Sequence, residues 1–107
     1  MRAVVIQCTC PDDATATRIA TALVEERLAA CVQRVPGVGA TYRWDGRVEN
    51  ATETLLLIKT AADRIPDVFR RVPELHPHDV PELLALDARD GTPAYLDWVI
   101  AQSRDDA

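Results

Sequence analysis

The sequence predicts an α+β fold of the ferredoxin-like, split βαβ kind, in which four antiparallel strands carry two helices on one face. Three observations predict it: a short apolar, β-branched run near the N-terminus, two segments with apolar residues every three or four positions, and an Asp-Gly turn between two long extended segments. The expected order is strand, helix, strand, strand, helix, strand and a C-terminal helix. One domain over residues 1–107 accommodates it.

The first strand and the first helix follow from the N-terminal thirty residues. Residues 3–8 form an apolar run typical of a buried strand, and Pro11 ends it. Asp12 supplies a helix N-cap, and apolar residues then recur at helical spacing as far as Ala30. We therefore expect an amphipathic helix over residues 12–30.

A long hairpin occupies the centre of the chain, with arms over residues 32–44 and 47–60 and a bulge or bend at Pro36-Gly37. Thirteen strand residues span about 43 Å, whereas a domain of 107 residues has a diameter of roughly 34 Å. An isolated two-stranded arm is marginal in water. We therefore expect the tip, which carries Tyr42 and Trp44, to lie on a neighbouring subunit.

The second half of the chain repeats the helix-strand pattern. Apolar spacing predicts a helix over residues 62–72, and three prolines predict an irregular, extended segment over 74–81. An apolar strand is expected over 82–87, and Pro93 opens the last helix. Residues 103–107 are expected to form a frayed polar tail.

Composition narrows the class of protein. Twelve basic and seventeen acidic residues give a net charge of −5, which argues against a nucleic-acid partner. The chain has no apolar run near the ~20 residues that span a bilayer, so no membrane partner is expected. Three cysteines, an odd number, argue against a secreted disulfide framework. The N-terminal apolar run is too short for a signal peptide, so we expect a cytoplasmic protein.

Cys8 and Cys10 lie two residues apart at the end of the first strand, so their side chains should point to one side. They could be a thiolate pair for a soft metal. Alternatively, Cys8 is a small buried hydrophobe and Cys10 a loop residue ahead of Pro11, which spacing alone favours. Cys31 lies in an apolar stretch and is expected to be structural.

His76 and His78 are the only histidines, and Asp79 follows them. In an extended segment the two rings point the same way, and a His-x-His pair with an acid can hold a borderline cation. Solvated loop side chains are the alternative. A site that combines Cys8 with His76 would be more persuasive, and it requires the two residues to meet in space.

Three further cationic residues and the absence of catalytic motifs complete the candidates. Lys59 closes the apolar returning strand, where it can either snorkel to the sheet rim or pair with an anionic ligand. Arg43 and Arg47 flank the Asp45-Gly46 turn and are typical of a solvated face. The chain has neither a Gly-x-Ser-x-Gly elbow nor a Gly-rich phosphate loop, so we expect no enzyme.

These segments, in order and spacing, resemble the divalent-cation tolerance, or CutA, family from about Val4 to Trp98. The motifs that carry the resemblance are Thr9-Cys10-Pro11-Asp12, Leu23 to Val32, Pro36-Gly37-Val38, Tyr42 to Gly46, Leu57 to Thr60, His76-Pro77 with Val80-Pro81-Glu82, and Tyr95 to Trp98.

The resemblance implies a homotrimer of ferredoxin-like subunits in which long hairpins exchange contacts between neighbours. It also implies an architecture similar to the PII-like signalling trimers, which bind small ligands in clefts between subunits. Candidate residues for such a cleft are Lys59, Arg43, Trp44, Asp79 and Glu82. The family is linked to tolerance of copper and other divalent cations, and no enzymatic activity is implied.

The resemblance also implies a divalent-cation site, with copper as the foremost ion. Cys8 matches a cysteine proposed as a copper ligand in some bacterial members, and His76 matches the histidine of the His-Pro pair. Leu75 stands where those members have an extra histidine. His78 stands where the family usually has tyrosine and could restore a ligand. The implied metal ligands are therefore Cys8, His76 and His78.

Overall fold

The structure, a computed structural model, describes residues 1–104, and residues 105–107 lie outside the described part. A short 3₁₀ turn, Ala62–Arg64, precedes α2. The strands and helices, in chain order, are β1 (Ala3–Cys10), α1 (Asp13–Glu25), β2 (Cys31–Trp44), β3 (Arg47–Ala61), α2 (Ile65–Leu75), β4 (Leu84–Asp87) and α3 (Pro93–Gln102).

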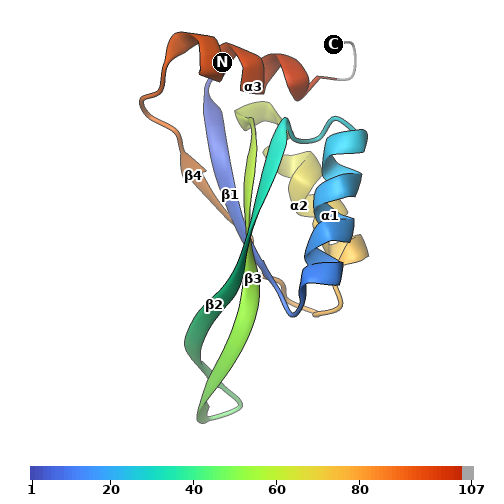
Figure 1. Cartoon of the computed structure of the whole chain (residues 1–107), viewed down its shortest axis with the longest axis vertical. Coiled ribbons are helices and arrows are strands. Elements are labelled where there is room, and N and C mark those ends of the chain that lie inside the picture. Colours follow the sequence, from blue (N-terminus) through green and yellow to red (C-terminus); the bar gives the residue numbers. More distant parts are fainter. Residues whose placement is uncertain (105–107) are drawn as a thin grey trace.

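The four strands form one antiparallel sheet in the order β2-β3-β1-β4, and α1 and α2 cover one face of it (Figure 1). This arrangement confirms the predicted ferredoxin-like fold. The core lies between that face and the two helices, where alternate residues of β1 and β3 meet the apolar stripes of the helices. Its largest fully buried side chains are Ile6, Ile19, Leu23, Leu56, Ile58, Val68 and Val72.

Helix α1 begins as predicted and ends earlier than predicted. The Asp12 carboxylate accepts a hydrogen bond from the backbone N–H of Thr15 at 2.7 Å, which caps the helix. The helix ends at Glu25 rather than at residue 30, because Arg27 adopts a left-handed backbone with φ of 58°. The N–H of Leu28 then donates to the carbonyl of Leu23 at 2.9 Å and closes the end of the helix.

Helix α2 continues past the predicted boundary at residue 72 and ends at Leu75. Pro73 lies inside its last turn, where a proline removes one backbone hydrogen bond without stopping the chain at once. The expectation of an extended segment from residue 74 is therefore wrong for its first two residues. Strand β4 begins at Leu84 rather than at residue 82, since Gln7 and Leu84 form the last pair of its ladder with β1.

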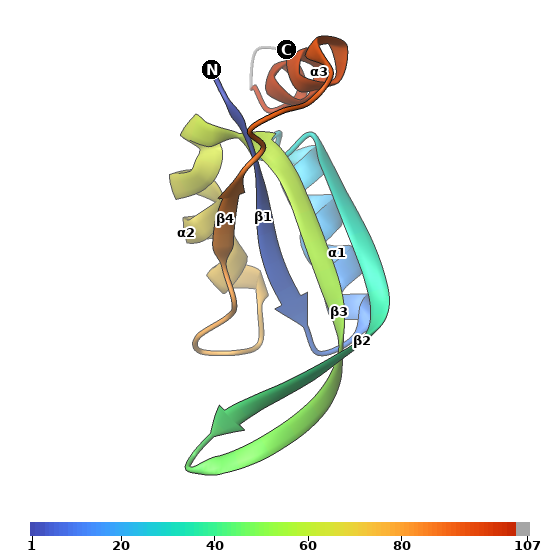
Figure 2. The same ribbon diagram turned by 90° about the vertical axis from the view of Figure 1, so that its left-hand side faces the viewer.

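The hairpin of β2 and β3 extends well beyond the rest of the domain (Figure 2). The molecule measures 44 × 26 × 22 Å, and a register shift between Val35 and Val38 confirms the predicted bulge. At the tip, Asp45 and Gly46 both have positive φ, which is the backbone that a tight hairpin turn requires. Tyr42 and Trp44 lie exposed on this arm. The arm is as long as the sequence predicts.

Helix α3 lies across one end of the sheet, near the N-terminus of the chain (Figure 1). Val99 is its buried residue, in a small apolar cluster with Ala3 and Ala30. Ser103 is also buried, and its hydroxyl donates to the carbonyl of Val99 at 2.6 Å. The expected frayed tail is therefore wrong at Ser103, and its last three residues, 105–107, lie outside the described residues. None of the helices within residues 1–104 is both long and apolar enough to cross a membrane.

The face of the sheet opposite the helices carries apolar side chains that nothing in the chain covers fully. Residues directly opposite each other in an antiparallel ladder share a face, so Val5 lies beside Leu86, and Gln7 lies between Leu57 and Leu84. Leu84 is 57% exposed and Leu86 48%. Large apolar side chains this exposed on one sheet face are typical of an interaction surface.

Candidate metal centre

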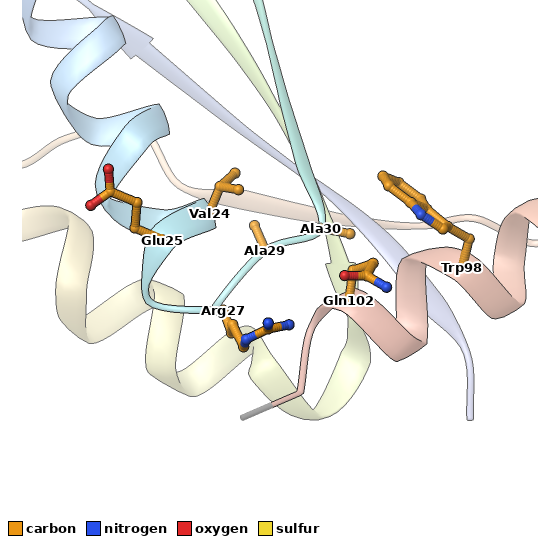
Figure 3. Close-up of a pocket in the computed structure, with 7 residues that line it drawn as sticks. All are labelled: Val24, Glu25, Arg27, Ala29, Ala30, Trp98 and Gln102. Carbon is orange, nitrogen blue, oxygen red and sulfur yellow. The ribbon is translucent and has the colours of Figure 1, made fainter. Parts of the chain in front are cut away.

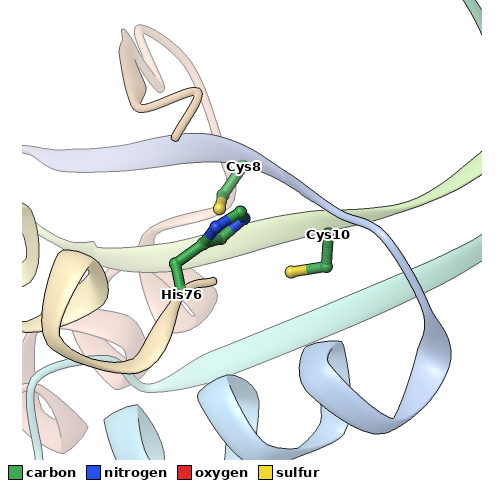
Figure 4. Close-up of side chains that lie close together, drawn as sticks. All are labelled: Cys8, Cys10 and His76. Carbon is green, nitrogen blue, oxygen red and sulfur yellow. The ribbon is translucent and has the colours of Figure 1, made fainter. Parts of the chain in front are cut away.

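Two cysteines and one histidine meet between the end of β1 and the end of α2 (Figure 4). One ligand atom from each of Cys8, Cys10 and His76 lies within 4.8 Å of the other two. Both thiols are fully buried, and the His76 side chain is nearly so. Within residues 1–104, this is the one group of three cysteine, histidine or acidic side chains whose ligand atoms lie close enough together to hold an ion.

Strand geometry explains why the two cysteines lie side by side. Side chains two residues apart on a strand point to the same face, and here that face is the buried one, which Ile6 also occupies. Cys10 is the last residue of β1 and pairs with Thr54 of β3. Interpreting Cys10 as a loop residue is therefore wrong. The prediction that both thiols point to one side is confirmed.

The His76 ring is held in one orientation by two hydrogen bonds to backbone groups, and a third fixes its main chain. It caps α2, with its own N–H donating to the carbonyl of Val72 at 2.9 Å. Its ring Nδ1 accepts the backbone N–H of His78 at 3.1 Å, so the ring proton lies on Nε2. Nε2–H donates to the carbonyl of Thr9 at 2.8 Å. The ring is thereby tied to the residue between the two cysteines.

The two thiols differ in acidity because they share one hydrogen bond. The hydrogen bond to Cys10, together with burial, raises the pKa of the Cys8 thiol far above its ordinary value. The same hydrogen bond lowers the pKa of Cys10 against the opposing effect of burial, and the Arg18 guanidinium contributes in the same direction. Cys10 is therefore the more acidic of the two thiols, and the Cys8 thiol also lies 3.9 Å from the carbonyl of Thr9, to which it donates.

The other predicted metal residues lie beside the cluster. His78 is exposed, and its ring centroid lies 4.9 Å from that of His76. Asp79 and Glu82 are exposed in the segment between α2 and β4. The structure thus brings Cys8 and His76 together, as a combined site requires, and adds Cys10.

The predicted cleft residues are spread over the chain. Arg43 pairs with Val48 near the tip of the hairpin, and Lys59 lies eleven residues further along β3, or roughly 36 Å at the rise of a strand. Trp44 is at the tip as well. Lys59 instead lies beside α3, where its Nζ donates to the hydroxyl of Tyr95 at 3.2 Å and lies 5.4 Å from the ring centroid.

A separate open cavity of about 310 Å³ lies between the C-terminal end of α1 and α3 (Figure 3). Arg27, Glu25 and Trp98 line it, with small apolar residues between them. None of the predicted metal or cleft residues contributes to this lining. The cavity is therefore distinct from the candidate metal centre.

The donor set defines the chemistry that the cluster can perform. Two sulfurs and one imidazole nitrogen suit soft and borderline ions such as copper and zinc, whereas magnesium and calcium prefer oxygen. The donors present thus fit a thiophilic metal. The two-residue spacing on an apolar strand predicts that Cys8 and Cys10 lie side by side, whereas no local pattern places His76 next to them.

Fold and site together define a small α+β protein of ferredoxin-like topology with a buried cluster of two cysteines and one histidine. Residues 4–102 match the family model described as CutA1 divalent ion tolerance protein, and the chain belongs to this family. The resemblance predicted from its motifs is confirmed.

Relatives of known name and structure agree with this membership. The divalent-cation tolerance protein CutA of Thermus thermophilus is 50% identical over 95 residues, covering 89% of this chain and 92% of the relative. The crystal structure of CutA from Xylella fastidiosa superposes with a TM-score of 0.94 at 41% identity, covering 97% of this chain and all of the other. A CutA from Archaeoglobus fulgidus, described as periplasmic, gives 0.92 at 31% identity, covering 95% and 99%.

Proposed function

We propose that this CutA-family chain contributes to tolerance of divalent cations by binding the ion directly, copper foremost, at Cys8 and His76. The observation that supports this proposal most strongly is the convergence of these side chains in a buried position, from parts of the chain almost seventy residues apart. The protein acts by binding rather than by catalysis. Its place of action is the cytoplasm, although the Archaeoglobus relative is described as periplasmic.

Calorimetric titration of the reduced protein with copper and zinc tests this proposal. Wild type should bind one copper per chain, and Cys8→Ser and His76→Ala should each weaken binding by more than tenfold, because each removes one donor. His78→Ala separates the two histidines, since its ring lies outside the cluster and its loss should change the affinity little. Unchanged copper affinity in Cys8→Ser and His76→Ala would refute direct binding at this site.

We place the site in a homotrimer of PII-like architecture. Two exposed surfaces support assembly: the apolar sheet face with Leu84 and Leu86, and the hairpin arm with Tyr42 and Trp44. Both need a partner of complementary apolar surface, and a further copy of the chain supplies it. Light scattering at micromolar concentration should give a mass near three protomers, and a monomer would contradict the proposal.

A second candidate function is a PII-like trimer that binds a small anionic ligand between subunits, without a physiological metal. Lys59 favours it, because this cation lies at the sheet rim beside Tyr95. In an assembled trimer, the other parts of the cleft would be lined by Arg43, Trp44, Asp79 and Glu82. A nucleotide such as ATP should then raise the melting temperature of wild type but not of Lys59→Met. Equal shifts in both proteins, or none, would exclude this function.

A further inference from the structure

We infer that Cys10 is a third ligand and that the Cys8–Cys10–His76 cluster binds copper in its monovalent form, as a three-coordinate dithiolate–imidazole site. This inference rests on the proposed function, namely that the chain binds copper at this cluster, and it specifies the ligands and takes the copper as supplied in the monovalent state. The family resemblance pointed to Cys8, His76 and His78. The structure replaces the exposed His78 by the buried Cys10 (Figure 4).

The separations between the donors fit one small ion. A metal equidistant from three donors, with metal–sulfur bonds of about 2.3 Å, holds two sulfurs roughly 4.0 Å apart in a trigonal plane. The three ligand atoms of the cluster already lie within 4.8 Å of one another. Contraction by about 1 Å closes the site, and rotation of the side chains supplies it.

The hydrogen bonds of His76 select the nitrogen that binds. Histidine ligands commonly donate their second ring N–H to a backbone carbonyl, which fixes the ring and makes it a better donor. Here Nε2–H already donates to the carbonyl of Thr9 at 2.8 Å. Nδ1 is therefore the nitrogen available to the metal. Its present partner, the backbone N–H of His78 at 3.1 Å, belongs to the exposed segment after α2 and can be displaced.

The number and kind of donors distinguish monovalent copper from the alternatives. Structural zinc takes four ligands, whereas this group offers three, and within residues 1–104 it includes no carboxylate or further histidine. Thiolates select monovalent copper over harder ions. Two thiol protons leave to solvent as the two copper–sulfur bonds form, so the complex carries one negative charge. The Arg18 guanidinium, which donates to the carbonyl of Leu75 at 2.8 Å, lies next to the cluster and offsets it.

Competition with a chromogenic chelator for monovalent copper, under anaerobic reducing conditions, tests the third ligand. Wild type should take one copper per chain. Cys10→Ser should weaken binding by more than about 100-fold, beyond the 10–100-fold that loss of an outer partner costs. Cys31→Ser is the matched control, because Cys31 is paired with Lys59 on the other face of the sheet. The copper affinity of this variant should stay within twofold of wild type. If a buried serine at position 10 prevents folding, Cys10→Ala, which adds no polar group, replaces it.

The outcomes separate this inference from the proposed function. If Cys8→Ser and His76→Ala lose monovalent copper while both Cys10 variants retain wild-type affinity, Cys10 is not a ligand and the proposed function stands. If none of these variants changes binding, the proposed function falls as well. Zinc supplied in tenfold excess should not displace the copper, and displacement would overturn the choice of ion.

Discussion

Shortening the hairpin should convert the proposed trimer into a folded monomer. The variant replaces residues 39–52 by Asn-Gly, so that the new two-residue turn joins Val38 to Glu53, which are paired in the ladder. The deleted segment contains none of the residues that form the described core. We therefore expect the shortened chain to keep a single cooperative unfolding transition in urea.

The loss of assembly can be estimated from the exposed side chains of the arm. Tyr42 is 44% exposed and Trp44 66% exposed in the single chain. Together they offer roughly 250 Å² of surface to a neighbour, or at most about 6 kcal/mol per arm at 25 cal/mol per Å². Even half of that value, about 3 kcal/mol, weakens each contact about 100-fold.

Sedimentation velocity at micromolar concentration measures the result. The shortened chain should sediment as a monomer and wild type as a trimer. Asp45→Asn is the matched control, because it introduces the same Asn-Gly turn into an intact arm and should remain trimeric. A shortened chain that still sediments as three protomers would show that the arm does not hold the assembly together.

Two further predictions concern stability within one chain. Thr60→Val should lower the free energy of unfolding in urea by about 1–2 kcal/mol, because the buried Thr60 hydroxyl donates to the carbonyl of Leu28 at 2.7 Å, whereas Thr60→Ser should keep most of the stability. Equal loss in both variants would point to packing instead. Hydrogen bonds from Arg70 and Arg64 hold the pKa of Asp67 below its ordinary value, so its contribution is complete above the unfolded pKa and is lost as pH falls through the folded pKa. Asp67→Asn should cost about 0.5 kcal/mol near pH 7 and progressively less as pH falls through the folded pKa of Asp67, and a cost that does not change with pH would contradict this origin.

Local patterns were sufficient to predict the sheet and the helices. The apolar run of β1, the Asp12 cap and the Asp45-Gly46 turn each reflect interactions between residues close in the chain. Boundaries were harder, because the left-handed backbone at Arg27 ends α1 and nothing in the local sequence marks it. Pro73 predicts too early an end for α2. The helix continues to Leu75, since a proline in the last turn of a helix costs only one hydrogen bond.

The candidate site was only partly predictable, because it depends on contacts between distant segments. The pairing of Cys8 with His76 joins the end of β1 to the end of α2, and no spacing rule gives that distance. Cys10 was expected in a loop because the predicted strand ended at residue 8, two residues before the end of β1. The exposed position of His78 follows from the turn after α2, which holds the ring of His76 inward and leaves that of His78 outside.

X-ray absorption at the copper edge, on the full chain loaded with monovalent copper under reducing conditions, tests most directly the claim that this cluster is a metal site. Two sulfur neighbours and one nitrogen neighbour are predicted for wild type. Cys10→Ser should show one sulfur neighbour fewer, and Cys31→Ser should match wild type. A wild-type copper ion surrounded by nitrogen and oxygen alone would contradict binding at Cys8, Cys10 and His76.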